Sequence, residues 1–515
     1  MAQTSGVELF SRISWFAIAI AGGISAGCAK CPDAQEYDED LQICKLKSGD
    51  DQTDADLQGK LLYEWDGGDG GFSPSVVYYP AGDVTNPGTT KVAVAFQALA
   101  TDGTQGSSIH LIRLEVSENG SVSPEPIDEI VRQSSGIIGA HLSMGYLPVS
   151  KKLVIAYFDE TDGKLYLAWE QGINDWSITQ VDGQDYPTGA FVDLAVDPYS
   201  DTVHLAYVDE GLHDLRYSMV QDGTVILGGV GASGLIDTGL VELGTGVISG
   251  GLIDKKVSVT VSPLGDPTIS YYEESSGQLR IAQYDSGSDV WIKRVLGTAT
   301  STLVQPDSDG RVVVDDEFVP WPDQLKVFKD GLEVTSPVRV ISATQIEIPD
   351  YDAASEYELQ YVVVPSANYG VWNDLATDES GTIYLCYYDF QKQSLSLATT
   401  AEPIAADQWQ IQTVDSSGNV GNRCVTGIRT LATESQVAYQ PIVAYFDGST
   451  ADIRAAYRRR GNWTSGDVDS PGWTGLELGM DVGSDGYVVV AYSVMDFDTQ
   501  TLALRVYRFL PESLE

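Results

Sequence analysis

A short recurring phrase constrains the fold of this chain more than any other feature. It consists of a small residue, an aromatic residue, any residue and an acid, and Ala156-Tyr157-Phe158-Asp159 is its clearest copy. The copies begin at Ala95, Ala156, Ala206, Ser270, Cys386, Ala444 and Ala491. The first and last copies are incomplete, as terminal repeats often are. Repetition at this scale predicts one structural unit per copy.

Each copy lies within the same local pattern of strands and turns. A β-rich run and a turn precede the phrase, as in Val192–Val196 followed by Asp197–Asp201. A third run such as Lys164–Trp169 follows, and then a fourth run that Trp176 opens and Val181-Asp182 ends. Four antiparallel strands in a unit of about 40–60 residues are typical of a β-propeller blade. The sequence therefore predicts an all-β protein, a seven-bladed β-propeller of four-stranded antiparallel blades.

Two departures from the regular spacing define the domain plan. The last unit lacks a fourth strand of its own, and we expect residues 61–66 to supply it from the N-terminal side and so close the ring. The copies at Ser270 and Cys386 lie more than twice as far apart as those at Ala156 and Ala206. Alternating runs in this excess predict an inserted small β-sandwich-like module over residues 300–366, between propeller parts at 60–299 and 367–515.

The N-terminus carries the features of an export signal over residues 1–27. Arg12 precedes the apolar run Ile13–Ile24, which is short for a membrane span of about 20 residues. The run ends in Ser25-Ala26-Gly27-Cys28, which resembles the lipobox of bacterial lipoproteins but has Ser25 where that family usually has an aliphatic residue. The resemblance implies a lipidated Cys28 and a place at the outer membrane or cell surface, with the lipid as the only membrane contact. The alternative is a plain signal peptide with an ordinary Cys28.

The remaining cysteines suit an oxidising compartment. If Cys28 is acylated, four of the five cysteines remain, an even number for disulfides. We expect Cys31 and Cys44 to pair within the tether 28–59, which resembles the short Cys-Pro…Cys knots that follow some lipoprotein signals. No His lies nearby and two thiols are too few for zinc. Cys386 and Cys424 belong to neighbouring units, and we expect either a disulfide between blades or two buried thiols.

The charge balance excludes one large class of function. The chain has 74 acidic and 30 basic residues and a net charge of −44. A nucleic-acid binder needs the opposite sign to displace counterions from phosphates. Because the acids are spread along the chain, we interpret them as the solvated surface of an exported protein, which we expect to be a monomer.

The acids of the repeated phrase are the first candidate site. They end the second strand of each unit, on the face that commonly holds the ligand of a propeller, and they are Asp159, Asp209, Glu273, Asp389 and Asp447. A ring of carboxylates there would suit Ca²⁺, a cationic group or a sugar. The favoured alternative is structural, because Asp accepts backbone N–H bonds in tight turns and a residue repeated in nearly every unit usually serves the fold. We expect no other cofactor.

Residues that break the repeat are the second set of candidates for the same face. They are Asp185-Tyr186, Trp372-Asn373 beside Asp374, and Asn422-Arg423. The repeated aromatic residues, by contrast, are expected to pack between blades. They are Tyr157, Tyr207, Tyr271, Tyr387 and Tyr445 of the phrase, and Trp176, Trp291, Trp409 and Trp463 of the fourth strand.

The predicted function is binding rather than catalysis. The four His have no metal-ligand spacing, and no G-x-S-x-G elbow occurs. We therefore expect a non-catalytic, envelope-anchored binding or scaffold protein with a protein or glycan partner. The units are loosely similar to sialidase-like and WD-type blades. The sialidase resemblance implies an alternative, a propeller glycoside hydrolase acting on extracellular glycans, although the Asp-box of that family is absent.

Overall fold

The structure is a computed structural model of the 515-residue chain. It describes residues 35–38, 43–46, 57, 59–79, 89–100, 106–183, 187–210, 214–227, 235–237, 257–273, 276–285, 290–314, 325–336, 338–342, 344–366, 368–401, 409–432, 437–459, 461–470, 474–496 and 501–511. The export signal 1–27, Cys28 and Cys31 lie outside these ranges. Cys44 lies in a two-stranded hairpin, β1 (Gln35–Asp38) with β2 (Ile43–Leu46).

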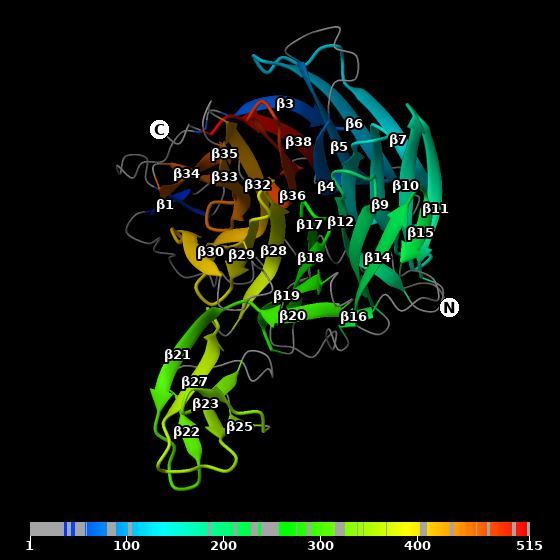
Figure 1. Ribbon diagram of the computed structural model, residues 1–515. Coiled ribbons are helices and arrows are strands. Elements are labelled where there is room, and N and C mark those ends of the chain that lie inside the picture. The colour runs from blue at the N-terminus through cyan, green and yellow to red at the C-terminus, as the bar shows by residue number, and fades with distance from the viewer. Residues whose placement is uncertain are drawn as a thin grey trace, which may run out of the picture.

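The regular structure of the described residues is entirely antiparallel β-sheet. Six sheets are each built from consecutive strands, and a seventh combines three consecutive strands with one from the N-terminal side (Figure 1). The first contains β4 (Gly70–Tyr79), β5 (Thr89–Leu99), β6 (Ser107–Ser117) and β7 (Ile127–Ser134). The second contains β8 (Ile138–Leu147), β9 (Lys152–Asp159), β10 (Lys164–Gly172) and β11 (Asp175–Asp182). The third contains β12 (Thr188–Val196), β13 (Val203–Asp209), β14 (Asp214–Gln221) and β15 (Thr224–Leu227), with the extra strand β16 (Leu235–Asp237).

The other four sheets follow the same plan. The fourth contains β17 (Val257–Val261), β18 (Pro267–Glu273), β19 (Gln278–Asp285) and β20 (Val290–Val295), and the fifth contains β28 (Tyr369–Thr377), β29 (Ile383–Asp389), β30 (Ser394–Thr400) and β31 (Gln410–Asp415). The sixth contains β32 (Val420–Ala432), β33 (Val437–Asp447), β34 (Asp452–Arg459) and β35 (Asn462–Asp469). The seventh contains β36 (Thr474–Val482), β37 (Val488–Asp496) and β38 (Thr501–Phe509) together with β3 (Lys60–Trp65).

The seven sheets form a closed ring around one axis. Their first strands contact one another in the order β4, β8, β12, β17, β28, β32 and β36, and β36 returns to β4. The last sheet takes its fourth strand from the N-terminal side, because β3 pairs antiparallel with β38 (Figure 1). This pairing covers an edge that would otherwise be open. The sequence-based expectation of an all-β propeller is confirmed.

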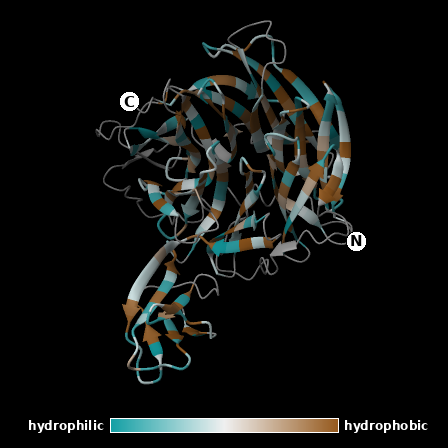
Figure 2. Cartoon of the chain, viewed as in Figure 1, coloured by the Kyte–Doolittle hydropathy of each residue, from teal (hydrophilic) through white to brown (hydrophobic). Residues whose placement is uncertain are grey.

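Hydrophobic side chains fill the spaces between neighbouring sheets. One such cluster joins Val77 and Ala93 of one sheet to Ile138, Ile155 and Tyr157 of the next. Both faces of the middle strands are therefore buried, which explains their continuous apolar runs in place of strict alternation (Figure 2). The tyrosines of the phrase are buried here, as expected. They are Tyr157, Tyr207, Tyr271, Tyr387 and Tyr445.

A separate module interrupts the ring between β20 and β28. It has two small sheets and lies outside the ring, to which two neighbouring segments connect it (Figure 1). One sheet contains β21 (Thr298–Val304), β27 (Tyr357–Val363), β23 (Lys326–Lys329) and β24 (Leu332–Glu333), and the other contains β22 (Arg311–Val313), β26 (Gln345–Glu347) and β25 (Arg339–Ser342). The two sheets share an apolar cluster of their own that includes Val312, Ile346 and Leu359.

No helix among the described residues is long and apolar enough to cross a membrane.

Candidate functional site

The axis of the ring holds a cavity of about 310 Å³. Residues from all seven innermost strands line it. This volume lies at the small end of the roughly 300–1,000 Å³ that is usual for ligand pockets. The cavity is the place where the sheets converge, so side chains far apart in the sequence meet there.

Six residues near the start of the innermost strands form one rim of the cavity, which we call the mouth ring. Each follows a glycine by two positions, as in Gly370-Val371-Trp372. The members are Ser73, His141, Phe191, Trp372, Arg423 and Glu477. The strand starts lie at the same face as the ends of the second strands, since Ile138 pairs with Asp159. The mouth ring therefore opens at the face that the sequence predicted to carry the ligand.

A β-bulge in each strand aims these side chains at the axis. The pairing of β8 with β9 skips residues between Ala140 and Ser143, and β12 with β13 does so between Ala190 and Asp193. Inside the bulges His141 has φ +52 and Phe191 has φ +54, a left-handed conformation that is uncommon for such side chains. Backbone conformations of this kind persist where the surrounding structure imposes them, and they cluster at functional sites.

The glycines two positions before Trp372 and Arg423 are required by packing as well as by φ. Gly370 has φ +92, and a Cβ there would lie 2.5 Å from Cβ of Leu279 in the neighbouring sheet. Gly421 has φ +102, and its Cβ would lie 2.7 Å from Cβ of Leu395. Glycine thus lets the innermost strand approach the neighbouring sheet, and the bulge then turns the next side chains inward.

The mouth ring combines aromatic rings with one ion pair. The rings of His141 and Phe191 lie with centroids 4.2 Å apart, and Trp372 contacts Tyr388 at 5.4 Å between centroids. The Arg423 guanidinium lies 3.7 Å from the Glu477 carboxylate. The indole Nε1 of Trp372 is buried and has no hydrogen-bond partner. A ligand at the mouth would therefore meet apolar faces, a cation, a carboxylate and an unused N–H donor.

A second ring of short polar side chains lies one step further along the strands and joins six successive sheets at five junctions, from the sheet of β4 to the sheet of β32. Each side-chain oxygen accepts a hydrogen bond from a backbone N–H of the following sheet. The pairs are Ser75 with Met144 at 3.0 Å, Ser143 with Leu194 at 3.2 Å, Asp193 with Val259 at 2.9 Å, Ser258 with Leu375 at 3.1 Å and Asp374 with Thr426 at 2.7 Å. This repeated pattern serves the fold, because it satisfies backbone donors between the sheets.

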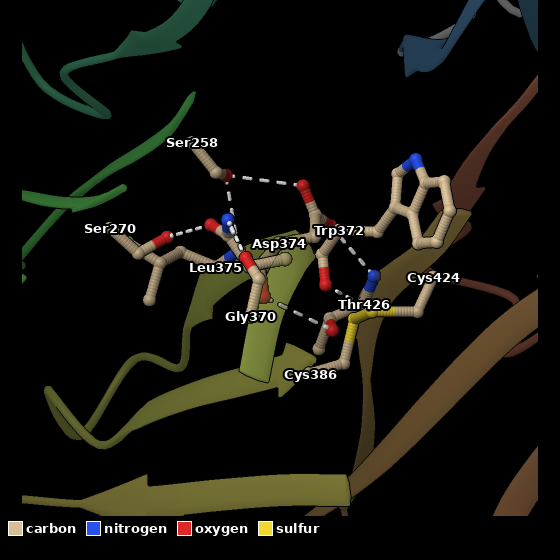
Figure 3. Close-up of a disulfide and its surroundings, with 10 residues drawn as sticks. Ser258, Ser270, Gly370, Trp372, Asp374, Leu375, Cys386, Cys424 and Thr426 are labelled. Atoms are coloured by element: carbon tan, nitrogen blue, oxygen red, sulfur yellow. Dashed lines mark hydrogen bonds between the residues drawn. A yellow bond between two sulfur atoms is a disulfide. The ribbon is translucent and has the colours of Figure 1, made fainter. Parts of the chain in front are cut away.

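Ser258 connects two carboxylates of this second ring. Its Oγ lies 3.1 Å from Oδ2 of Asp193. It also lies 3.1 Å from Oδ1 of Asp374 (Figure 3). The same Oγ accepts the N–H of Leu375. Both carboxylates therefore have hydroxyl or N–H donors within the ring, and their role there is the joining of three sheets.

A disulfide supports the part of the mouth that carries Trp372 and Arg423. Cys386 of β29 is bonded to Cys424 of β32, with 2.13 Å between the sulfurs, so it links two adjacent sheets (Figure 3). Cys386 pairs across the sheet with Asp374, two residues after Trp372, and Cys424 directly follows Arg423. The Sγ of Cys424 lies 4.0 Å from the Trp372 carbonyl oxygen. The covalent bond thus holds two mouth residues of different sheets in a fixed relation.

The acids of the repeated phrase lie elsewhere, in turns. All five end the second strand of their sheet and are buried: Asp159, Asp209, Glu273, Asp389 and Asp447. The carboxylate oxygens of Asp159, Glu273, Asp389 and Asp447 accept hydrogen bonds from turn N–H groups. Examples are Asp159 from Asp162 at 3.0 Å and Asp447 from Ser449 at 2.8 Å. Burial raises the pKa of Asp447, and the turn N–H groups and Arg454 oppose this rise.

Four of these acids also have a basic partner. The closest contacts are Asp209 with Arg216 at 2.7 Å, Glu273 with Arg280 at 3.2 Å, Asp389 with Lys392 at 3.3 Å and Asp447 with Arg454 at 3.6 Å. In the parts of the chain that the structure describes, no three His, Cys, Asp or Glu side chains are grouped to hold a metal ion. The geometry of these acids is that of turn caps with charge partners.

The mouth ring contains residues that the sequence indicated and residues that it did not. Trp372, Asp374 and Arg423 line the cavity, whereas Asp185 and Tyr186 lie outside the described residues. Sequence reasoning missed four members of the ring, namely Ser73, His141, Phe191 and Glu477. The glycine two positions earlier is the signal that would have found them. The fourth-strand Trp176, Trp291, Trp409 and Trp463 pack in the clusters between sheets, as expected.

The fold and the cavity define the chain as a β-propeller with an axial cavity. No family model and no curated protein matches the sequence. Among solved structures, a protein of unknown function from Dyadobacter fermentans is 10% identical, with 88% of this chain and 98% of that chain covered and a TM-score of 0.42. The fucose-specific lectin from Aleuria aurantia is also 10% identical, with 78% and 96% covered and a TM-score of 0.39. A fructofuranosidase from Schwanniomyces occidentalis, complexed with fructosylnystose, is 8% identical, with 82% and 76% covered and a TM-score of 0.27.

Proposed function

We propose that this chain is a non-catalytic binding protein of the bacterial envelope that holds its ligand at the mouth ring of the axial cavity. The proposal takes the seven sheets around the axis as seven blades. One observation carries it: six equivalent positions hold six different side chains, Ser73, His141, Phe191, Trp372, Arg423 and Glu477. Positions that serve a repeated fold tend to repeat, as the buried tyrosines do. Positions that differ while pointing into one cavity are suited to a particular ligand.

Binding is favoured over hydrolysis by the surroundings of the carboxylates. The resemblance to sialidases implies three arginines that converge on a carboxylated sugar. In the described residues one arginine, Arg423, lines the cavity, and Glu477 lies beside it. Asp193 and Asp374 accept hydrogen bonds within the second ring, where they join neighbouring sheets. Their placement supports a structural role rather than the acid and base pair of a glycosidase.

The proposal also includes the cellular location of the protein. Cys28 carries the lipid, the tether up to residue 59 spaces the propeller from the membrane, and the net charge of −44 keeps the body in solution. Replacing Cys28→Ser tests the anchor by fractionation of cells. Release from the membrane fraction is expected, and continued membrane association would refute it.

A capture experiment tests the mouth. Immobilised wild-type protein and a Trp372→Ala, Arg423→Ala double variant are exposed to an envelope extract, each with Ca²⁺ and with EDTA. Tyr199→Ala is the matched control, because Tyr199 is exposed on the turn between β12 and β13, at the end of these strands away from the mouth. The wild type and the control should retain a species that the double variant loses. Equal retention by all three, or glycoside turnover by the wild type alone, contradicts the proposal.

A further inference from the structure

We infer that the ligand of the mouth ring is the end group of a neutral saccharide, with Trp372 as its hydrogen-bond donor and aromatic platform. This inference rests on the proposed function and names the chemical class that the site takes. Four properties of the cavity lead to it: its charge, its aromatic rings, its unused donor and its size.

The charge of the site favours a ligand without net charge. Arg423 and Glu477 are the charged members of the mouth ring, and they neutralise one another at 3.7 Å. Behind them lie the carboxylates of Asp193 and Asp374, which also line the cavity. An anionic ligand would meet those carboxylates within a chain of net charge −44. A cationic ligand would be repelled by the Arg423 guanidinium. The site therefore accommodates neither a positively nor a negatively charged ligand well.

The aromatic rings favour a ligand with an apolar face and a polar edge. His141 and Phe191 come from adjacent sheets and lie against each other at 4.2 Å, while Trp372 approaches from another side of the axis. A sugar ring presents C–H groups on its face and hydroxyls around its edge. Such a ring can rest on an aromatic surface while its edge meets the Arg423 and Glu477 side chains. Arg423 can only donate and Glu477, when ionised, can only accept, and a hydroxyl satisfies both.

The indole N–H of Trp372 indicates that the ligand carries an acceptor. This Nε1 atom is buried and lacks a hydrogen-bond partner in the structure. Buried donors are normally satisfied, and one that is left over at a cavity is a reason to look for a ligand group. A sugar hydroxyl supplies the acceptor, whereas an aliphatic side chain of a peptide would leave the N–H unpaired. The volume of about 310 Å³ suits an end group better than a long segment.

The test uses a panel of sugars on the full chain. Binding of the methyl glycosides of glucose, galactose, mannose, fucose and N-acetylglucosamine is measured by saturation-transfer NMR and calorimetry, beside anionic glucuronic acid and cationic glucosamine. Trp372→Phe keeps a ring and removes the N–H, and we expect it to weaken binding about tenfold. Trp463→Phe is the matched control, because Trp463 packs between sheets away from the cavity. That variant should bind as the wild type does.

The outcomes separate this inference from the proposed function. Binding of at least one neutral glycoside that Trp372→Phe weakens and Trp463→Phe does not supports the inference. Two outcomes overturn the neutral saccharide class and leave the proposed binding function in place. One is a preference for the charged sugars. The other is no binding of any glycoside while the extract still yields a species captured through Trp372 and Arg423. No glycoside bound and no species captured refutes both.

Discussion

The Tyr207 hydroxyl donates a hydrogen bond of 2.8 Å to Oδ2 of Asp182, and the two residues belong to neighbouring sheets. Tyr207 is the aromatic residue of the repeated phrase, and Asp182 is the acid that ends the fourth strand of the preceding unit. The same contact joins Tyr445 to Asp415 and Tyr492 to Asp469. Two separate elements of the sequence pattern are therefore the two halves of one contact between sheets.

An arginine strengthens each of these three contacts from the strand beside the tyrosine. Arg216, Arg454 and Arg505 lie at 3.4, 3.2 and 3.1 Å from the respective aspartates. Burial alone would raise the pKa of Asp415, but the hydrogen bond from Tyr445 and the charge of Arg454 lower it below its usual range. The aspartate is thereby held ionised between the sheets, where an unpaired carboxylate would be unfavourable.

Removing one hydroxyl measures what this contact contributes. Tyr207→Phe keeps the buried ring and leaves Asp182 with Arg216 but without its hydroxyl donor. We expect a loss of about 1–3 kcal/mol in the free energy of unfolding, the usual effect of removing one partner of a buried charged hydrogen bond. Urea unfolding followed by fluorescence measures it. Tyr199→Phe, on an exposed turn, is the control and should change stability by less than about 0.5 kcal/mol. Equal stability of the two variants would show that the contact is not stabilising.

The disulfide should stabilise both the ring and the mouth. A double Cys386→Ala, Cys424→Ala variant removes a link across 38 residues of sequence, which corresponds to about 4 kcal/mol in the loop-entropy treatment. Thermal unfolding of the variant and the wild type, each with and without a reducing agent, measures it. The wild type should lose stability on complete reduction and approach the variant, whose own stability should not respond. A variant as stable as the oxidised wild type would contradict the expectation.

The sequence predicted the blade architecture well because the signals for it are local. The phrase acids such as Asp159 end the second strand, and the phrase tyrosines such as Tyr157 lie two residues before that end. Both placements follow from the alternation of β-runs and turns. The long gap before Cys386 likewise pointed to inserted strands, which run from β21 to β27. Strand bounds differ slightly from expectation, since β3 spans Lys60–Trp65 rather than 61–66.

The mouth ring was harder to predict because its geometry depends on bulges. A bulge shifts the register by its extra residue, so strand alternation does not tell which side chain faces the axis. His141 and Phe191 follow Gly139 and Gly189 and carry positive φ values, a property that composition does not reveal. Trp372 and Arg423 were predicted as candidates for the ligand-binding face only because they break the repeat. The regularity of the phrase acids, by contrast, favoured a role in turns over a ligand site, and in the structure they end the second strands.

The second ring provides a further test of how the sheets are joined. Ser258→Ala leaves the N–H of Leu375 without its acceptor and removes the hydroxyl that lies between Asp193 and Asp374. We expect a loss of about 1–3 kcal/mol, since a buried N–H loses its acceptor and the carboxylate that receives the hydroxyl hydrogen loses its donor. Ser342→Ala, on the exposed strand β25 of the inserted module, is the matched control and should be neutral within about 0.5 kcal/mol. A neutral Ser258→Ala would show that water replaces the hydroxyl.

The buried His204 should make stability depend on pH in a defined window. Burial lowers the pKa of His204 from 6.5 to about 4, and its Nδ1 lies 2.6 Å from the Tyr217 hydroxyl. Between pH 6.5 and pH 4 the unfolded chain binds a proton that the folded chain does not. Stability from this group is therefore fully present above pH 6.5 and is lost as the pH falls, by up to about 3 kcal/mol near pH 4.

A His204→Asn variant isolates this contribution, because Asn keeps a polar group near the position of Nδ1 and does not titrate. The variant should be less stable than the wild type at pH 7, where the imidazole fills its site without charge. Urea unfolding at half-unit steps from pH 7 to pH 4 should show the difference between the two proteins shrinking by about 2–3 kcal/mol. Other groups that titrate in this range affect both proteins alike and cancel in the comparison. A difference that stays constant over the window would mean that His204 keeps an ordinary pKa in the folded chain.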